Sequence, residues 1–249
     1  MTELATTREV ELADALTLVR ERLAKAADAA GRNNGEIELL PITKFFPATD
    51  VLILAHLGCD AFGESREQEA AAKSAECNSA EPHSPIRWHM VGRIQRNKAR
   101  SIANWAYAAH SVDSAKLIAA LDRASSDALA AGGRSDPLQV YIQVSLDGDV
   151  ARGGVDVARR DQVDELCAQV HAAPGLEFVG LMGIPPLGAD ADQAFARLQA
   201  EHRRVQGFYQ HRLGLSAGMS SDLEAAVEHG STCVRVGTAV MGQRPLTSP

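Results

Sequence analysis

Apolar positions along this chain follow two periods, one typical of helices and one typical of short buried strands. Near the N-terminus, a leucine or valine recurs at the three- and four-residue spacing of one helix face. The positions are Leu12, Leu16, Val19 and Leu23. They predict a helix over residues 7–30, and Gly31 is a typical residue to end it.

From residue 37 onward, short apolar runs alternate with helical patterns. The predicted strands are residues 37–44, 59–62, 86–91, 105–109, 138–146, 176–182, 214–216 and 233–236. The predicted helices are residues 48–57, 67–76, 95–103, 112–131, 156–172, 190–213 and 222–229, and residues 78–85 are predicted to form a loop. Pro41 cannot donate a ladder hydrogen bond, so it predicts a local irregularity in the first strand.

Eight strands, each but the last followed by a helix, form the pattern of a (β/α)₈ TIM barrel. Nothing in the sequence resembles a linker, a low-complexity tract or a domain boundary, so residues 1–249 are expected to form one domain. The extra N-terminal helix would plug or flank the barrel floor. The competing α/β layout is an open, doubly wound sheet, but no Gly-x-Gly-x-x-Gly follows the first strand.

The composition narrows the range of partners. The chain has 25 Lys and Arg against 32 Asp and Glu, a formal net charge of −7, which argues against nucleic acid or an acidic membrane surface. Its four cysteines are scattered without a Cys-x-x-Cys pair, so neither a zinc site nor a disulfide framework is indicated. The N-terminus lacks an apolar core for export, and no apolar run is long enough to span a bilayer. We therefore expect a cytoplasmic protein.

Lys44 is the first candidate for chemistry, because it ends the first predicted strand and precedes Phe45, Phe46 and Pro47. A lysine with aromatic neighbours and no carboxylate beside it is expected to be poorly hydrated. Desolvation disfavours the ammonium and lowers its pKa, which suits an amine that attacks a carbonyl. The alternative is a strand-end lysine whose ammonium simply reaches into water.

Barrels of this kind keep their chemistry at the C-terminal ends of the strands, and phosphate commonly binds at the loops after strands seven and eight. Here those loops are Ser216-Ala217-Gly218-Met219-Ser220-Ser221-Asp222 and Arg235-Val236-Gly237-Thr238-Ala239. Small residues let backbone N–H groups approach a phosphate, and the hydroxyls of Ser216, Ser220 and Thr238 can donate as well. The alternative is that these residues only cap helices.

Lys44 and this phosphate pocket would face the same cavity. A lysine that can form a Schiff base beside a phosphate site suits either a sugar-phosphate aldolase or a protein that binds pyridoxal 5′-phosphate. Arg235 favours the cofactor, because a guanidinium beside the pyridine nitrogen would keep that nitrogen unprotonated and make the ring a weaker electron sink. The alternative for Arg235 is a buried salt bridge to a nearby Asp or Glu.

The chain also resembles a known family, from about residue 39 to residue 244. The motifs that carry the likeness are Ile42-Thr43-Lys44, Phe62-Gly63-Glu64, Trp88-His89-Met90-Val91-Gly92-Arg93-Ile94-Gln95-Arg96-Asn97-Lys98, His110-Ser111-Val112-Asp113, Gly180-Leu181-Met182-Gly183-Ile184, Leu215 with the first phosphate loop, and Gly230-Ser231-Thr232-Cys233-Val234 with the second. So many matches in one order are highly specific. They resemble the YggS/PROSC family of pyridoxal phosphate homeostasis proteins, which look like the barrel domain of alanine racemase without its second domain.

By this resemblance, Lys44 would hold pyridoxal 5′-phosphate as an aldimine and Arg235 would lie at the pyridine nitrogen. The phosphate would be held by Ser216, Ser220, Gly237 and Thr238, with Met219 contributing its backbone. Three positions depart from the family. Ser65 stands where Asn is frequent, which implies a contact near the ring that is lost or made through water. Ala217 replaces a usual Met and implies looser packing under the phosphate loop, and Pro41 is a local variation.

The resemblance implies a protein that binds pyridoxal 5′-phosphate and maintains its homeostasis by reversible transimination at an open barrel mouth, with little or no turnover. An amino-acid racemase on the same cofactor is the alternative, but it needs a second base opposite the lysine. A cofactor-free aldolase would need a carboxylate or tyrosine near the lysine, and no candidate stands out. An interaction protein that uses the bound cofactor as a signal is not separated from the first function by sequence. We expect a monomer whose partners are the cofactor, amino acids and apo-enzymes.

Other polar residues are given structural roles. His89 follows a tryptophan inside a strand and is interpreted as a hydrogen-bonded core histidine. The only tyrosines, Tyr107, Tyr141 and Tyr209, lie outside motifs that indicate acid or base chemistry. One predicted helix carries a basic cluster, Arg93, Arg96, Lys98 and Arg100. A solvated face is its first interpretation, and a phosphate-rich partner or a second cofactor-binding surface is the alternative.

Overall fold

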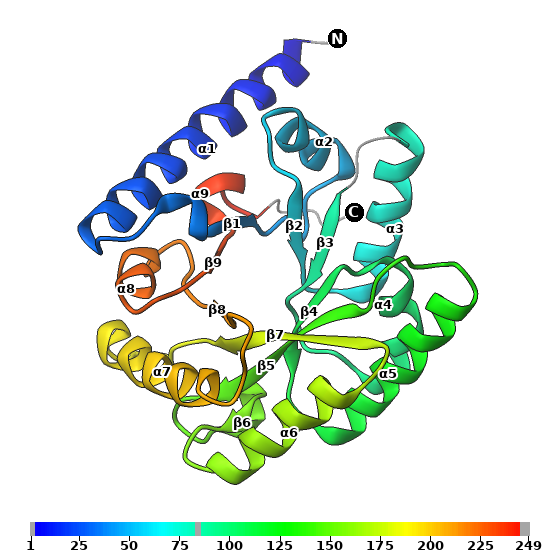
Figure 1. Cartoon of the computed structure of the whole chain (residues 1–249). Helices are drawn as coiled ribbons and strands as arrows, with labels where there is room; N and C mark the ends of the chain where they lie inside the picture. The colour runs from blue at the N-terminus through cyan, green and yellow to red at the C-terminus, as the bar shows by residue number, and fades with distance from the viewer. Residues whose placement is uncertain (1–2, 83–85, 245–249) are drawn as a thin grey trace.

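Parallel strands form a barrel with helices around it (Figure 1). A computed structural model describes residues 3–82 and 86–244 of the chain. Within those residues, one sheet of nine strands has the order β1-β9-β8-β7-β5-β4-β3-β2, with β6 paired to β5. The paired strands are parallel throughout. The predicted (β/α)₈ barrel is confirmed, while one domain over residues 1–249 stays a prediction.

The elements alternate as the pattern predicted. The strands are β1 Glu38–Pro41, β2 Ala61–Glu64, β3 Arg87–Met90, β4 Ala108–Val112, β5 Leu138–Ser145, β6 Val155–Asp156, β7 Leu176–Gly183, β8 Gly214–Ser216 and β9 Cys233–Val236. The α-helices are α1 Glu3–Ala29, α2 Ala48–His56, α3 Glu67–Ala80, α4 Ala99–Trp105, α5 Ala115–Ala130, α6 Arg160–Ala172, α7 Ala191–Gln206, α8 Leu223–Glu228 and α9 Thr238–Met241. Short 3₁₀ helices are η1 Asn34–Glu36, η2 Arg96–Lys98 and η3 Val150–Arg152.

The barrel closes between β1 and β2 through the bridge from Ile42 to Gly63. Ile42 donates its N–H to Val236 of β9 (2.9 Å), and Thr43 donates its N–H to Gly63 of β2 (3.0 Å). A Cβ at Gly63 would collide with the Ile42 side chain, so glycine permits this approach. Because alternate residues of a strand face opposite neighbours, the nitrogen of Pro41 faces β2 before pairing to β2 begins. Pro41 therefore ends β1 at the seam of the barrel without the loss of a ladder bond.

Helix α1 flanks the barrel and does not plug its floor. Its main contacts are with α2, α8 and α9, and Figure 1 shows it running alongside them outside the strands. The four positions of its predicted apolar face are buried in one cluster with Val234 and Val236 of β9. Since α9 has only four residues, it is too short to cover β9, and α1 supplies the covering layer.

Several predicted boundaries are wrong for local reasons. The predicted strand over residues 105–109 is shifted, because Trp105 still belongs to α4 and β4 runs to Val112. Ser114 precedes α5 with an extended backbone (φ −152°, ψ 145°), so this helix begins at Ala115 and not at residue 112. The predicted helix over residues 190–213 ends at Gln206, next to Gly207.

The remaining differences lie at loops. The predicted helix over residues 95–103 is divided into η2 and α4, and the one over residues 156–172 begins only at Arg160 because β6 precedes it. Helix α3 extends to Ala80, into the predicted loop of residues 78–85, of which residues 83–85 lie outside the described part. Over the described ranges, no helix combines the length and the apolar character that a membrane crossing requires.

Candidate functional site

Six of the seven predicted site residues line one cavity of about 340 Å³ at the C-terminal ends of β1, β8 and β9. They are Lys44, Met219, Ser220, Arg235, Gly237 and Thr238. Three cations face this cavity, namely Lys44, Arg235 and Arg244, whereas no Asp, Glu, His, Tyr or Cys of residues 3–82 and 86–244 lines it. The cavity, here called the Lys44 cavity, therefore suits an anionic ligand.

The lysine of this cavity is exposed. Lys44 lies in a turn three residues after the end of β1, not at the end of the strand, and its side chain is open to solvent. Its Nζ lies 5.8 Å from the centre of the Phe45 ring. The expectation of a poorly hydrated ammonium at a strand end is therefore wrong. The structure instead presents an amine that a ligand can reach from solvent.

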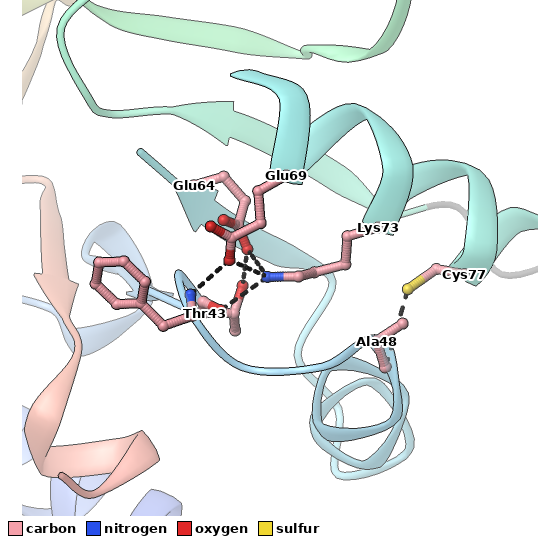
Figure 2. A network of polar contacts seen from close by, with 7 residues as sticks. Thr43, Ala48, Glu64, Glu69, Lys73 and Cys77 are labelled. Carbon is pink, nitrogen blue, oxygen red and sulfur yellow. Dashed lines mark hydrogen bonds and ion pairs between the residues drawn. The ribbon is translucent and has the colours of Figure 1, made fainter. Parts of the chain in front are cut away.

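A buried polar network from α3 fixes the turn that carries Lys44 (Figure 2). Lys73 of α3 donates to the Thr43 carbonyl (2.9 Å) and to the Glu64 carboxylate (2.6 Å). Glu64 also accepts the Thr43 hydroxyl (2.7 Å). Glu69 accepts the N–H of Phe45 (2.5 Å) and lies 3.3 Å from the Lys73 ammonium. The residues on both sides of Lys44 are thus held in place, while its own side chain extends into the cavity.

Burial and backbone strain accompany this network. Glu64 is fully buried, and burial raises the pKa of its carboxyl against the opposing effect of the Lys73 ammonium. Phe45 has a φ of 70°, a value that residues other than glycine rarely adopt. Its ring lies under the guanidinium of Arg244 (3.9 Å to the ring centre) and near that of Arg66 (4.8 Å). Strained residues of this kind concentrate at functional sites.

The loops after β8 and β9 meet at the cavity. The Ser220 hydroxyl accepts the N–H of Ala239 (3.2 Å), which leaves its own proton free to donate to a ligand. Gly237 and Thr238 begin α9, whose first N–H groups have no acceptor inside the helix. The N–H of Met219 already donates to the Asp222 carboxylate (2.6 Å), a bond that competes with the contribution predicted for the Met219 backbone.

Ser216, the seventh predicted residue, is fully buried and does not line the cavity. Its hydroxyl accepts a hydrogen bond from Arg235 Nη1 (2.6 Å) and lies 2.8 Å from His110 Nδ1. Arg235 also donates to the Gly183 carbonyl (3.1 Å). His110 Nε2 in turn lies 2.9 Å from His89 Nδ1. Arg235, Ser216, His110 and His89 thus form a line of polar contacts inside the barrel, here called the interior chain.

The interior chain holds one buried cation and two neutral imidazoles. Burial lowers the pKa of Arg235, which is 5% exposed, and no carboxylate of the described residues lies within ion-pair distance of it. The alternative of a buried salt bridge at Arg235 is therefore not found. Burial also lowers the pKa of His89 to about 3 and that of His110 well below its usual value. The interpretation of His89 as a hydrogen-bonded core histidine is confirmed.

Because both imidazoles are neutral, each has one donor nitrogen and one acceptor nitrogen. One arrangement of these donors gives the Ser216 hydroxyl proton an acceptor. Ser216 donates to Nδ1 of His110, and Nε2 of His110 donates to Nδ1 of His89. His89 Nε2 then has no hydrogen-bond partner within the described part of the chain. Tyr107 and Tyr141 pack against these rings, with ring centres 5.6 Å from His89 and 4.4 Å from His110, respectively.

The other residues singled out by sequence lie elsewhere. Tyr209 packs on Phe178 (5.0 Å between ring centres), away from the Lys44 cavity. Ser65 lines a different cavity, and Ala217 is buried in the core between the sheet and the helices. The predicted basic cluster is dispersed: Lys98 pairs with Glu67 (3.0 Å), Arg100 is exposed, and Arg93 and Arg96 line a second cavity beyond β3.

Sequence reasoning missed part of the site. Glu69 and Lys73 lie four residues apart on a helix that was predicted, and this spacing could have indicated their ion pair. Glu64 belongs to the motif Phe62-Gly63-Glu64, but nothing in the sequence showed that its carboxylate accepts hydrogen bonds from both Thr43 and Lys73. Arg244 follows the last strand, and no sequence pattern singles it out. Only the structure shows that it lines the cavity.

Comparisons with known proteins agree with this geometry. The family model described as alanine racemase, N-terminal domain, matches residues 17–245. A protein of Mycobacterium bovis named pyridoxal phosphate homeostasis protein is 65% identical over 248 residues, which cover 97% of this chain and 96% of that protein. A protein of Escherichia coli with the same name is 32% identical over 237 residues, with 94% and 97% covered.

Solved structures give the same picture. The structure of PipY from Synechococcus elongatus, with PLP bound, is 32% identical and has a TM-score of 0.76, with 93% of this chain and 100% of that chain covered. Alanine racemase from Corynebacterium glutamicum has a TM-score of 0.63 at 15% identity, with 92% of this chain and 60% of that chain covered. The latter likeness shows a shared fold alone.

Proposed function

Because the chain belongs to the family of pyridoxal phosphate homeostasis proteins, we propose that it binds pyridoxal 5′-phosphate in the Lys44 cavity and maintains the supply of this cofactor. The observation that carries the proposal is the composition of that cavity. A reachable amine and two guanidinium groups face it, and no carboxylate of the described residues does. An aldehyde that carries a phosphate matches both features.

Lys44, Ser220, Arg235, Gly237 and Thr238 suit the roles that the sequence predicted for them. Ser216 does not line the cavity, and the Met219 N–H is bonded to Asp222. When bound, the cofactor would supply an aldehyde with which the Lys44 amine can react reversibly, with loss of water. The phosphate of the cofactor could accept the free hydroxyl proton of Ser220 and the N–H groups of Gly237 and Thr238 at the start of α9. The Arg235 guanidinium, held by its hydrogen bonds to Ser216 and to the Gly183 carbonyl, would face the ring nitrogen of the cofactor.

We further propose that the protein holds and releases the cofactor with little or no turnover. An amino-acid racemase needs a second acid or base across the cavity from the lysine. Among the described lining residues, the only ionisable groups besides Lys44 are the guanidinium groups of Arg235 and Arg244. Guanidinium does not release its proton in proteins, so neither residue can serve as that base. Amino acids and apo-enzymes as recipients, the cytoplasmic location and the monomeric state belong to the same proposal.

The proposal is tested by reduction of the loaded protein. After incubation with pyridoxal 5′-phosphate, the wild type should be yellow, and borohydride followed by peptide mapping should place the label on Lys44. Lys44→Ala should stay colourless, while Lys25→Ala, which removes an exposed lysine from α1, should behave as the wild type. A colourless wild type, or a label on another lysine, contradicts the proposal.

The racemase alternative is tested separately. The loaded protein is incubated in deuterated water with a panel of amino acids, and α-proton exchange is followed by NMR. We expect exchange no faster than that caused by free pyridoxal 5′-phosphate. Catalytic exchange that disappears in Lys44→Ala would establish an enzyme instead.

A further inference from the structure

A second cavity, of about 530 Å³, opens at the C-terminal ends of β3, β4, β5 and β7. It shares no lining residue with the Lys44 cavity. Its volume lies in the range of small-molecule sites. Here it is called the Gln143 cavity, after the residue of β5 that lines it.

Positive charge dominates the wall of the Gln143 cavity. Four cationic side chains line it, Arg93, Arg96, Lys116 and Arg152, against the single carboxylate of Asp113. Asp113 is already engaged, since its Oδ2 accepts the N–H of Gly154 (3.0 Å). Arg93, Arg96 and Lys116 form no ion pair with any described residue. Arg152 lies 3.9 Å from Asp147 and donates a hydrogen bond to the Pro185 carbonyl (3.2 Å). In a chain with a net charge of −7, this excess of unpaired cations in one concavity indicates an anionic ligand.

A buried amide without a partner points into the same space. Gln143 is 8% exposed, and its side chain makes no hydrogen bond to any residue of the described ranges. A Cβ at Gly153 would lie 3.4 Å from Gln143 Nε2 and 3.5 Å from Asp113 Oδ2, so the absence of a side chain at residue 153 leaves room beside the amide. The amide atoms of Gln143 are not among the fully buried polar atoms that lack a partner in the described residues, so they are accessible from the cavity. A ligand in the cavity would therefore find a side-chain amide with its hydrogen-bonding groups free.

The start of α5 adds donors to this wall. Ser114, Lys116 and Leu117 line the cavity, and α5 has sixteen residues. The Ser114 side chain makes no capping bond, so its hydroxyl is available to a ligand. The first N–H groups of the helix have no intrahelical acceptor, and the helix dipole favours an anion at this end. These donors and the cations lie around one concavity together with Gln143.

We propose that the Gln143 cavity binds a small phosphomonoester, with the phosphate held by Arg93, Arg96, Lys116 and the start of α5 and with the Gln143 amide bonded to the rest of the molecule. Phosphate is favoured because several cations and one helix start match a dianionic group with three acceptor oxygens better than a single carboxylate. The neighbouring cavity at Ser65 offers a contrast, since two carboxylates, Glu67 and Glu69, line it. Its cations are Arg66, Lys98 and Arg93, and Arg93 lines both cavities. The site is additional to the proposed cofactor site and does not depend on it.

The test measures phosphate binding after the Lys44 cavity has been filled. The protein is saturated with pyridoxal 5′-phosphate, reduced with borohydride and titrated with inorganic phosphate by calorimetry and ³¹P NMR. One equivalent should still bind. Arg96→Glu and Gln143→Glu should each weaken this binding by about tenfold or more, because each removes a donor and adds a negative charge. Arg100→Glu should change it by less than about twofold, since this exposed residue of the same basic run does not line the cavity.

Three outcomes overturn the inference: no phosphate bound by the filled protein, an equal loss in Arg100→Glu, or full binding in both cavity variants. Arg96 is exposed, so its variant should fold, and circular dichroism checks both variants. Titrations with pyridoxine 5′-phosphate, which lacks the aldehyde, and with ribose 5-phosphate distinguish a vitamin ligand from another phosphomonoester. If Lys44 fixes no cofactor, the proposed function fails, but the effect of Arg96→Glu is still measured on the unfilled protein.

Discussion

Two of the three cations that line the Lys44 cavity, Lys44 and Arg235, are supported in opposite ways. Lys44 is exposed on a turn, and only its flanking residues are fixed, by Glu69, Lys73 and Glu64. Arg235 is buried in β9 and its guanidinium is itself fixed, by Ser216 and the Gly183 carbonyl. A covalent anchor that must exchange its ligand has to be reachable, whereas a charge that sets the electronics of a ring has to stay in one place. The two supports match these two requirements.

The largest expected effect comes from removal of the support under Lys44. Lys73→Met leaves the Glu64 carboxylate fully buried without its ion-pair partner and should lower the free energy of unfolding by about 3–5 kcal/mol. The Thr43 carbonyl also loses a donor, so the turn should loosen and the reaction of Lys44 with the cofactor should slow. Urea unfolding and the rate of colour formation measure the two effects.

The matched control is Lys25→Met, which removes an exposed lysine from another helix and should change stability by less than about 0.5 kcal/mol. If both variants unfold at the same urea concentration, the network does not support the turn. If Lys73→Met is unstable but reacts at the wild-type rate, the network stabilises the fold without positioning Lys44.

The contrast between these supports also explains what the sequence could predict. The succession of strands follows from short apolar runs, and the barrel pattern then assigned Lys44, Ser220, Arg235, Gly237 and Thr238 to one cavity, although β1 ends three residues before Lys44. The exposure of Lys44 could not be predicted, because it depends on a turn in which Phe45 has a positive φ. No residue type in Thr43-Lys44-Phe45 indicates such a turn.

The hydrogen bonds inside the barrel could not be predicted from the hydrophobic pattern either. Ser216 was predicted to hold phosphate as a hydroxyl in a loop, but β8 directs it into the barrel, where Arg235 and His110 take both sides of the hydroxyl. The register of β8 decides which way the Ser216 side chain points. That register is set by pairing with β7 and β9, which are separated from β8 by long stretches of sequence. Local periodicity carries no information on such contacts.

The next effect concerns the fixed cation. Arg235→Met removes the donor to Ser216 and Gly183 and should cost about 1–3 kcal/mol, because two buried acceptors lose a partner while one buried charge is relieved. The colour of the loaded protein should also shift, since the ring nitrogen loses its neighbouring cation. Unfolding curves and visible spectra of the reduced and unreduced forms test this. An unchanged spectrum would place Arg235 away from the ring.

Acid should lower the stability of the folded protein through the two histidines of the interior chain. The pKa of His89 is lowered to about 3 in the folded protein, so between pH 6.5 and 3 only the unfolded chain gains a proton at this residue. Stability should therefore fall as the pH drops below 6.5, by about 1.4 kcal/mol per pH unit for each such histidine. His110, with its pKa lowered as well, adds to the same slope.

The variant His89→Asn isolates one part of that slope. The Asn amide oxygen can replace Nδ1 as the acceptor for His110, and His89 Nε2 has no partner to lose among the described residues. Urea unfolding at pH 7 and at pH 5.5 should show a smaller loss of stability on acidification than in the wild type. An identical loss in both proteins would mean that His89 takes up its proton in the folded state too.

The smallest expected effect on stability is the one that best separates the two cations. Lys44→Ala removes an exposed side chain whose ammonium forms no hydrogen bond or ion pair in the described part of the chain, so the free energy of unfolding should change by less than about 0.5 kcal/mol. The same change should abolish attachment of the cofactor. Urea unfolding without cofactor, beside Arg235→Met, checks the comparison. A loss in Lys44→Ala as large as that in Arg235→Met would show that the anchor is part of the structural support and not only a group presented by it.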